Sequence, residues 1–196
     1  MNYLAHAYLS FDHREILVGN MISDFIKGKK KFDYDKGIQW GIMLHRMIDE
    51  FTDNHPSTRQ AKSFFKPDYR LYSGAFVDVV YDHFLAMDKD EWIATDLHSF
   101  SLGVYEKLSQ FQSVFPQKFS RVFYYMQTEN WLFHYQFKQS IRNSFAGLVR
   151  RARYIDDYQT AYALFEKHYS QLQDCYKNFF PSVKGFAREK IRDLPG

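Results

Sequence analysis

The fold is decided most clearly by the stretch Ile42-Met43-Leu44-His45-Arg46-Met47-Ile48-Asp49-Glu50-Phe51-Thr52-Asp53. Within it, Leu44 and Ile48 belong to an apolar stripe with the spacing of one helix face. His45, Asp49 and Asp53 follow one another every four residues beside that stripe, along the edge of the surface that must be buried. A buried carboxylate is costly unless it is paired or bound to a metal. The stretch therefore predicts a helix that contributes both to the hydrophobic core and to a functional site.

Helical periodicity continues along most of the chain, and no stretch shows the alternation typical of strands. Gly and Pro are confined mainly to expected junctions. We therefore expect an all-α fold, with helices near residues 2–10, 14–27, 36–54, 57–65, 70–87, 90–111, 117–128, 134–154, 158–179 and 182–192. Because no linker or low-complexity segment interrupts the chain, we expect one compact helical domain over residues 1–196.

Composition restricts the class of protein. Apolar residues make up 45% of the chain and charged residues 25%, as in ordinary soluble globular proteins. No apolar run approaches the roughly 20 residues that span a bilayer, and the first residues lack the positive segment of a secretion signal. The one cysteine, Cys175, cannot form an internal disulfide, in keeping with a reducing compartment. We expect a cytoplasmic protein that does not bind membranes.

Charge is distributed unevenly along the chain. Up to Lys118 there are 14 Lys and Arg against 16 Asp and Glu, whereas from Phe119 onward there are 12 against 7. The acidic part suits neutralisation by a metal, and the basic, aromatic half over residues 119–196 suits an acidic partner. Nucleic acid is acidic too, but no motif of a known nucleic-acid-binding module is present, which disfavours it.

A second polar cluster lies in Asp78-Val79-Val80-Tyr81-Asp82-His83-Phe84-Leu85. Asp78 and Asp82 share a helix face, and His83 projects about 100° away from Asp82. His6 and Asp24 are further polar residues within apolar segments. Imidazole and carboxylate ligands without thiolate suit Mn, Fe, Mg or a catalytic Zn. Together these residues predict a metal site for phosphate-ester chemistry, formed mainly by residues 1–85.

Several of these residues also suit a structural role. His6 and Asp24, taken singly, are typical of hydrogen-bonded buried groups or helix caps. Asp53 and His55 lie near a predicted helix end and could simply terminate it. The lysine-rich segment that begins at Lys27 is either a solvated loop or a contact for phosphate or an acidic protein beside Asp24.

Four segments, in this order and at these separations, resemble the acyl-carrier-protein phosphodiesterases: Asn2-Tyr3-Leu4-Ala5-His6, Gly19-Asn20-Met21-Ile22-Ser23-Asp24-Phe25-Ile26-Lys27-Gly28, Leu44-His45-Arg46-Met47-Ile48-Asp49-Glu50-Phe51-Thr52-Asp53-Asn54-His55-Pro56 and Asp78-Val79-Val80-Tyr81-Asp82-His83-Phe84-Leu85. The resemblance implies an all-helical bundle distantly related to the HD-type phosphohydrolases. It also implies a manganese-dependent hydrolase of fatty acid biosynthesis. Such an enzyme cleaves the phosphodiester that joins 4′-phosphopantetheine to a serine of holo acyl carrier protein, leaving the apo carrier.

Within that resemblance we assign roles by spacing. The predicted ligands of one or two divalent ions are Asp24, His45, Asp49, Asp82 and His83. Mn²⁺ is the expected ion, with Mg²⁺, Fe²⁺ and Zn²⁺ as alternatives. Asp78 or Asp53 would orient or deprotonate the attacking water, and His6 or His55 would protonate the departing serine oxygen. The residues expected to offset negative charge on the substrate are Lys27 and Arg46.

The expected partner is an acyl carrier protein, a small acidic helical protein. A complementary basic surface is expected from Arg150, Arg151, Arg153, Lys184, Arg188, Lys190 and Arg192. Two alternatives stay open at this point. One is an HD-like phosphohydrolase that acts on a nucleotide or another small phosphate ester. The other is a non-catalytic helical module that binds carrier protein or nucleic acid.

Overall fold

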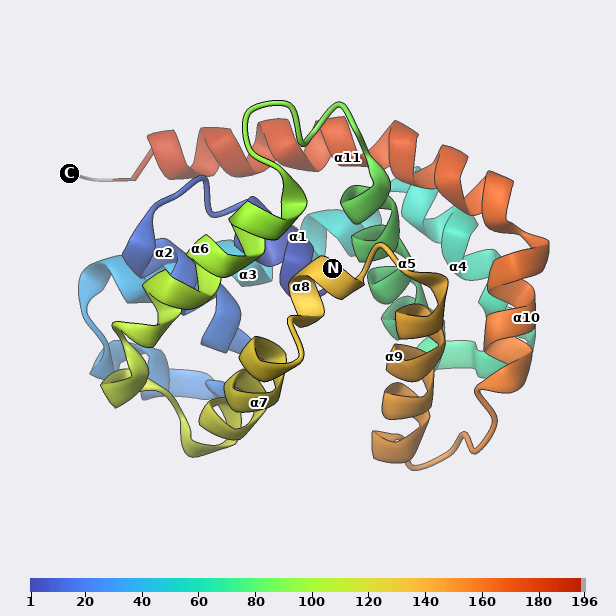
Figure 1. Ribbon diagram of the computed structural model, residues 1–196, viewed down its shortest axis with the longest axis horizontal. Helices are drawn as coiled ribbons and strands as arrows, with labels where there is room; N and C mark the ends of the chain where they lie inside the picture. Colours follow the sequence, from blue (N-terminus) through green and yellow to red (C-terminus); the bar gives the residue numbers. More distant parts are fainter. Residues whose placement is uncertain (195–196) are drawn as a thin grey trace.

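The computed structural model describes residues 1–194, which form helices and no strands (Figure 1), so the prediction of an all-α fold is confirmed. Residues 195 and 196, the end of the predicted domain, lie outside the described residues. The α-helices are α1 (Tyr3–Tyr8), α2 (Arg14–Ile22), α3 (Lys36–Asn54), α4 (Pro56–Tyr69), α5 (Ser73–Met87), α6 (Leu97–Ser109), α7 (Gln117–Thr128), α8 (Trp131–His134), α9 (Lys138–Arg151), α10 (Gln159–Lys167) and α11 (Tyr169–Arg192). The 3₁₀ helices are η1 (Ser23–Phe25), η2 (Gly28–Asp33), η3 (Arg70–Tyr72) and η4 (Gln112–Val114). No helix among the described residues combines the length and the hydropathy that crossing a membrane requires.

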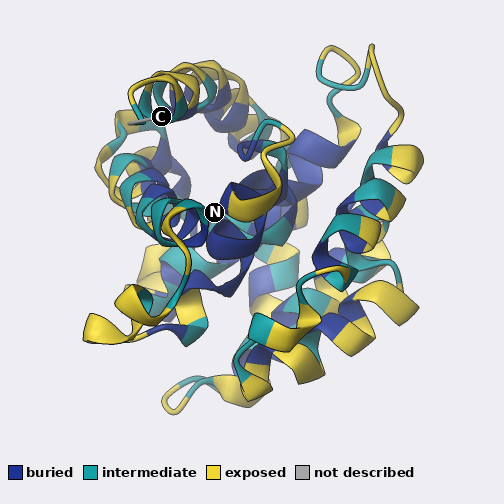
Figure 2. Cartoon of the chain, turned by 90° about the vertical axis from the view of Figure 1, so that its left-hand side faces the viewer, coloured by how far each residue is buried: buried dark blue, intermediate teal, exposed yellow. Residues whose placement is uncertain are grey.

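Helix α5 is buried along most of its length. From Phe76 to Ala86 nearly every residue is buried, so apolar side chains point in all directions from the helix axis. This pattern is typical of a helix surrounded by other helices, and α5 packs against α1, α4, α9 and α11. Figure 2 shows the buried faces of the helices turned toward one another and the exposed faces turned outward. Asp82 and His83 consequently occupy the interior of the protein.

Helices α2 and α3 pack at very short range. A Cβ atom at Gly19 would lie 2.1 Å from the carbonyl oxygen of Ile38, and one at Gly41 would lie 2.3 Å from that of Ile16. Two helix backbones approach this closely only where side chains are absent. The contact brings the end of α2 beside the middle of α3, where His45 lies.

Several predicted helix bounds differ from the structure: the helix predicted over 57–65 extends to Tyr69, the one over 14–27 ends at Ile22, and the one over 134–154 begins at Lys138. Three further differences have a clear physical basis. Helix α11 continues through Pro181, because its packing against α3, α4 and α5 compensates for the missing backbone hydrogen bond. The predicted helix over residues 158–179 divides at His168, where no Gly or Pro signals an end. The helix predicted from residue 90 begins only at Leu97, where the Asp96 side chain accepts a hydrogen bond from the Ser99 amide. The bounds predicted for α3 and α7, 36–54 and 117–128, are confirmed.

Candidate metal centre

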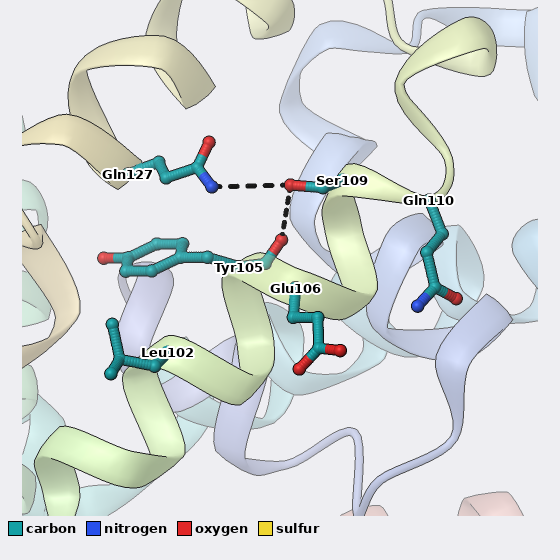
Figure 3. A pocket seen from close by; sticks show the side chains of 6 residues that line it. All are labelled: Leu102, Tyr105, Glu106, Ser109, Gln110 and Gln127. Atoms are coloured by element: carbon teal, nitrogen blue, oxygen red, sulfur yellow. Dashed lines mark hydrogen bonds between the residues drawn. The ribbon is translucent and has the colours of Figure 1, made fainter.

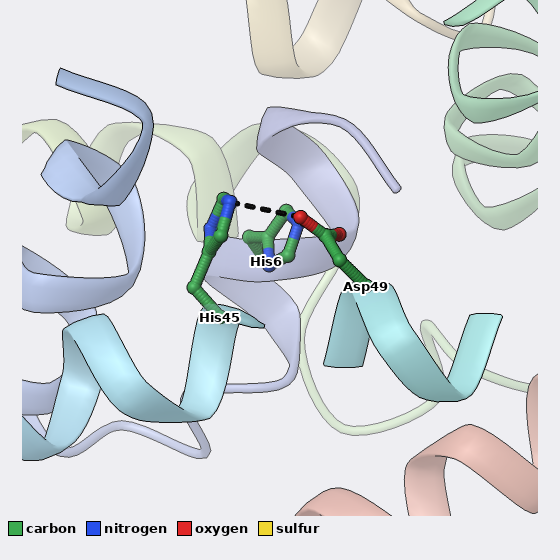
Figure 4. Close-up of side chains that lie close together, drawn as sticks. All are labelled: His6, His45 and Asp49. Atoms are coloured by element: carbon green, nitrogen blue, oxygen red, sulfur yellow. Dashed lines mark ion pairs between the residues drawn. The ribbon is translucent and has the colours of Figure 1, made fainter. Parts of the chain in front are cut away.

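Helices α1 and α3 bring three potential metal ligands together: His6 from α1, and His45 and Asp49 from α3 (Figure 4). Their ligand atoms all lie within 4.8 Å of one another. Asp49 Oδ1 lies 3.2 Å from His6 Nε2, and Asp49 Oδ2 lies 3.1 Å from His45 Nε2. Asp24, from η1, places its Oδ1 3.2 Å from His45 Nε2. Two imidazoles and two carboxylates form a donor set that suits a divalent cation.

Asn20 holds both imidazoles in place. Its side-chain Oδ1 lies 2.8 Å from His6 Nδ1, and its backbone oxygen lies 2.8 Å from His45 Nδ1. Since both partners are oxygen acceptors, each Nδ1 carries the proton, and each Nε2 is left for Asp49 or a metal. The Asn20 Nδ2 group donates to the His6 carbonyl and to Ser10 Oγ, which fixes the orientation of its amide.

The charges of this cluster depend on one another. Burial lowers the pKa of His6 to about 4, and the charge of His45 acts in the same direction. Burial also lowers the pKa of His45, but the hydrogen bonds and charges of Asp24 and Asp49 outweigh it and raise that pKa to about 9. Burial raises the pKa of Asp49, yet both histidines oppose this and hold it well below the usual range. Without a metal, His45 is therefore a cation near neutral pH and His6 is neutral.

Whether these residues fit a metal can be tested on the hydrogen bonding of His6 Nε2. This nitrogen is buried and has no hydrogen-bond partner among the described residues, although Asp49 Oδ1 is 3.2 Å away. Buried polar atoms are nearly always satisfied, so an unpartnered one calls for an explanation. A lone pair directed into a cluster of carboxylates is what a metal ligand provides, and the group fits a divalent ion.

The amino group of Met1 joins Asp78 to the cluster. It lies 2.9 Å from Asp78 Oδ1 and 3.4 Å from Asp49 Oδ1. Burial lowers the pKa of the amino group, but Asp78 and Asp49 raise it to about 11. Burial raises the pKa of Asp78, and the Met1 charge opposes that shift. Asp78 thus borders the cluster as a carboxyl group that is easier to protonate than usual.

The structure places Asp82 beneath the first turn of α1. Its Oδ2 accepts a hydrogen bond from the Leu4 amide at 2.7 Å, and its Oδ1 accepts from the Asn2 and Ala5 amides, each at 3.3 Å. These are amides that the start of a helix leaves without partners. Asp82 therefore anchors α1, and with it His6. Burial raises the pKa of Asp82 to about 7, against the effect of these amides and of the Met1 charge.

His83 lies in a different environment from Asp82. Its Nδ1 is 2.7 Å from the Tyr135 carbonyl oxygen, and its Nε2 is 2.9 Å from the Tyr169 hydroxyl. Both nitrogens are thus engaged. The helix turns by about 100° per residue, which directs His83 toward Tyr135, just before α9, and toward the start of α11. Of the predicted ligands, the structure brings Asp24, His45 and Asp49 together, and it leaves Asp82 and His83 outside their cluster.

The remaining predicted residues make contacts other than with the three clustered ligands. Asp53 pairs with Lys62 Nζ at 2.6 Å on the exposed side of α3. His55 is the N-cap of α4, where its Nδ1 accepts from the Ser57 amide at 3.3 Å. The position of His55 at the junction of α3 and α4 fits the alternative interpretation of a helix end, whereas Asp53 is engaged in an ion pair with α4. The two predicted substrate-binding residues are exposed, and one of them, Arg46, donates to the Ile26 carbonyl.

A cavity of about 650 Å³ opens beside the cluster. Asp24 and Asp78 line it, and so do the rings of Tyr3 and Trp131, whose centroids are 6.5 Å apart. Helix α9 contributes a polar and basic wall. The cavity is therefore large enough for a chain-like organic group and reaches two carboxylates of the candidate centre.

A second hollow lies between α6 and α7 (Figure 3). Its lining residues are Leu102, Tyr105, Glu106, Ser109, Gln110 and Gln127. Ser109 Oγ donates to the Tyr105 carbonyl and is 3.5 Å from Gln127 Nε2. This hollow contains no histidine and none of the predicted site residues. The cavity that Asp24 and Asp78 line is the candidate site for substrate.

Sequence comparisons find relatives over nearly the whole chain. The family model described as acyl carrier protein phosphodiesterase matches residues 1–183. The chain is 30% identical to the acyl carrier protein phosphodiesterase of Yersinia pestis, over 97% of this chain and 99% of that relative. The same values hold for the relative of that name from Serratia proteamaculans (strain 568). The one from Photorhabdus laumondii is 28% identical, over 97% and 96% of the two chains.

These matches define a phosphoric diester hydrolase, the predicted class of enzyme. The chain belongs to the acyl carrier protein phosphodiesterase family, which confirms the resemblance seen in its four sequence segments. No solved structure matches the chain, and the relation to HD-type phosphohydrolases stays a prediction.

Proposed function

We propose that this protein hydrolyses the phosphodiester that joins 4′-phosphopantetheine to holo acyl carrier protein, and that it does so with a divalent metal ion. The products are the apo carrier and the free arm, in prosthetic-group turnover of fatty acid biosynthesis in the cytoplasm. The observation that carries this proposal is the cluster of His6, His45 and Asp49 beside a cavity, in a chain of the acyl carrier protein phosphodiesterase family.

The proposed ligands are His6 Nε2, His45 Nε2 and the Asp49 carboxylate, with Asp24 as a fourth. Mn²⁺ is the proposed ion, since imidazole and carboxylate without thiolate suit it, and Mg²⁺, Fe²⁺ and Zn²⁺ are the alternatives. Asp82 has an indirect role in this proposal. It accepts hydrogen bonds from the first turn of α1 and so fixes the helix on which the ligand His6 lies. Asn20 sets the ring orientation of both histidines, as partners of metal-bound histidines commonly do.

His6, His45 and Asp49 would hold a divalent ion, which would supply Lewis acidity for the phosphoryl group and for a water near neutral pH. The chain's own residues then have two tasks. Asp24, which lines the cavity and contacts His45, orients the attacking water. Asp78, whose pKa burial raises, transfers a proton to the departing serine oxygen. The Met1 amino group, hydrogen-bonded to Asp78 Oδ1, limits the accumulation of negative charge between Asp78 and Asp49.

Mass spectrometry of holo acyl carrier protein tests this proposal. Holo carrier is incubated with the chelator-treated protein, with and without added Mn²⁺. We expect the carrier to lose the mass of one phosphopantetheine arm only when Mn²⁺ is present. An unchanged carrier mass, together with hydrolysis of a nucleotide or another small phosphate ester, would assign the site to a different substrate.

A further inference from the structure

Two arginines at the end of α9 converge on one point of the cavity wall. A Cβ atom at Gly147 would lie 3.5 Å from Arg151 Nη1 and 3.9 Å from Arg150 Nη2. Residues three and four positions apart share a helix face, so both side chains fold back over the preceding turn. Gly147, Arg150 and Arg151 all line the cavity that Asp24 and Asp78 also line.

The two guanidinium groups are not neutralised by the protein. Among residues 1–194, no carboxylate oxygen lies within 4.0 Å of either group. Like charges held near each other repel, and an anion placed between them removes that repulsion. By contrast, Lys184, another member of the predicted basic surface, is paired with Glu91. The arginine pair on α9 is thus a cationic site without a carboxylate partner among the described residues.

The position of the pair relative to the metal cluster follows from the packing of α5 on α9. His83 near the end of α5 contacts Tyr135, just before α9, whereas Phe76 near the start of α5 packs on Phe145 with ring centroids 4.9 Å apart. The two helices are therefore antiparallel. The start of α5, which carries Asp78, lies beside the end of α9, which carries Arg151.

Tyr3 provides an independent link between the two ends of the cavity. Burial raises the pKa of Tyr3 to about 12, and the charges of Asp24 and Arg151 act on it in opposite directions. The hydroxyl is therefore within electrostatic range of both the candidate metal cluster and the arginine pair. Tyr3, Asp24 and Arg151 also line the same cavity.

We propose that Arg150 and Arg151 form an anion-binding pair that holds the phosphate of the phosphopantetheine arm in this cavity. The pair takes the role that Lys27 and Arg46 were expected to fill from the sequence. Guanidinium groups suit this role because they present several N–H donors in a plane that matches phosphate oxygens. Toward its other end, α9 lines the cavity with Ser140 and Asn143, which suit the amide groups of such an arm. This inference rests on the proposed function for the identity of the ligand.

Calorimetric titration of the chelator-treated protein with free 4′-phosphopantetheine tests the pair without any turnover. We expect Arg150→Gln and Arg151→Gln each to weaken binding roughly tenfold or more, since each removes a charged hydrogen bond to phosphate. Arg153→Gln is the matched control, because Arg153 lies outside the cavity lining and packs over Tyr154. The affinity of this control for 4′-phosphopantetheine should stay within about twofold of that of the unsubstituted protein. Pantetheine without phosphate should bind the unsubstituted protein and the three variants equally weakly.

Steady-state kinetics with holo carrier and Mn²⁺ separate this inference from the alternatives. The pair predicts a raised KM in both arginine variants and unchanged thermal unfolding. If the arginines only stabilise the end of α9, the variants unfold earlier while the affinity for phosphopantetheine and KM stay as they were, which overturns the inference. Phosphopantetheine binding that depends on the arginines, without hydrolysis of holo carrier, would reject the proposed function alone. Hydrolysis of holo carrier, together with a phosphopantetheine affinity that neither arginine substitution changes, would reject the arginine pair alone.

Discussion

The imidazole rings of His6 and His45 are stacked, with centroids 3.9 Å apart and planes 15° from parallel. Two such rings repel each other if both are protonated, and burial with the charge of His45 keeps His6 neutral. The stack places both Nε2 atoms against the same carboxylate, that of Asp49. This pairing of residues 39 positions apart in the sequence is the geometric core of the proposed metal centre.

Replacing Asn20 should weaken metal binding without touching a ligand. Asn20→Ala removes the acceptor of His6 Nδ1 and frees that ring to rotate, so we expect a loss of roughly 10- to 100-fold in metal affinity. Titration of the chelator-treated protein with Mn²⁺ measures this. Asn54→Ala is the control, because Asn54 is an exposed amide at the end of α3. Equal affinities in the two variants would show that Asn20 does not orient the ligands.

Metal binding should release a proton from His45. In the metal-free protein its pKa is about 9, so His45 is protonated at pH 7 and must lose that proton to donate its Nε2 lone pair. The apparent metal affinity should consequently rise with pH up to about 9 and level off above it. Calorimetry in buffers of different ionisation enthalpy counts the released protons. A pH-independent affinity, with no proton released, would exclude His45 as a ligand.

Asp82 should matter for folding more than for direct metal binding. Asp82→Ala leaves the buried amides of Leu4 and Ala5 without an acceptor, so the free energy of unfolding should fall by about 3 kcal/mol. Asp53→Ala, which removes only an exposed ion pair, should change it by less than about 1 kcal/mol. Chemical denaturation of the chelator-treated proteins measures both values. Unchanged stability combined with lost metal binding would make Asp82 a ligand after all.

The close contact of α2 with α3 should tolerate no side chain at Gly19. In Gly19→Ala the new methyl group would lie 2.1 Å from the Ile38 carbonyl oxygen, a backbone atom that cannot swing aside. We expect a destabilisation of about 1–3 kcal/mol from overpacking. Metal affinity should fall as well, because the contact positions Asn20 against His45. Gly103→Ala is the control: a Cβ there meets no atom within 4 Å, and alanine favours the helix by up to about 1 kcal/mol. Similar thermal unfolding of both variants would contradict this account of the contact.

Much of the fold could be predicted from local patterns. Helix α3 has both an apolar stripe and clear ends, and its predicted bounds agree with the structure. Helix ends that depend on long-range packing could not be predicted. Pro181 is a helix breaker in isolation, yet it lies inside α11, where contacts with three other helices hold the backbone.

The candidate site was predictable only in part, for a similar reason. His45 and Asp49 are four residues apart on one helix, and that spacing alone places them together. Asp82 lies at the same four-residue spacing from Asp78, but it is surrounded by the amides at the start of α1. Nothing in the sequence near residue 82 distinguishes a carboxylate that anchors a helix from one that binds a metal. The position of Asn20 between two histidines also depends on the packing of α1, α2 and α3.

The most direct test of the central claim is the metal content of ligand variants together with their turnover of holo acyl carrier protein. His6→Ala, Asp49→Ala and His83→Ala are stripped with chelator, reloaded with Mn²⁺ and assayed in the same sample. We predict that the first two variants lose both bound Mn²⁺ and arm release, whereas His83→Ala keeps its metal. Full metal content and activity in His6→Ala and Asp49→Ala, with loss of both in His83→Ala, would contradict the account.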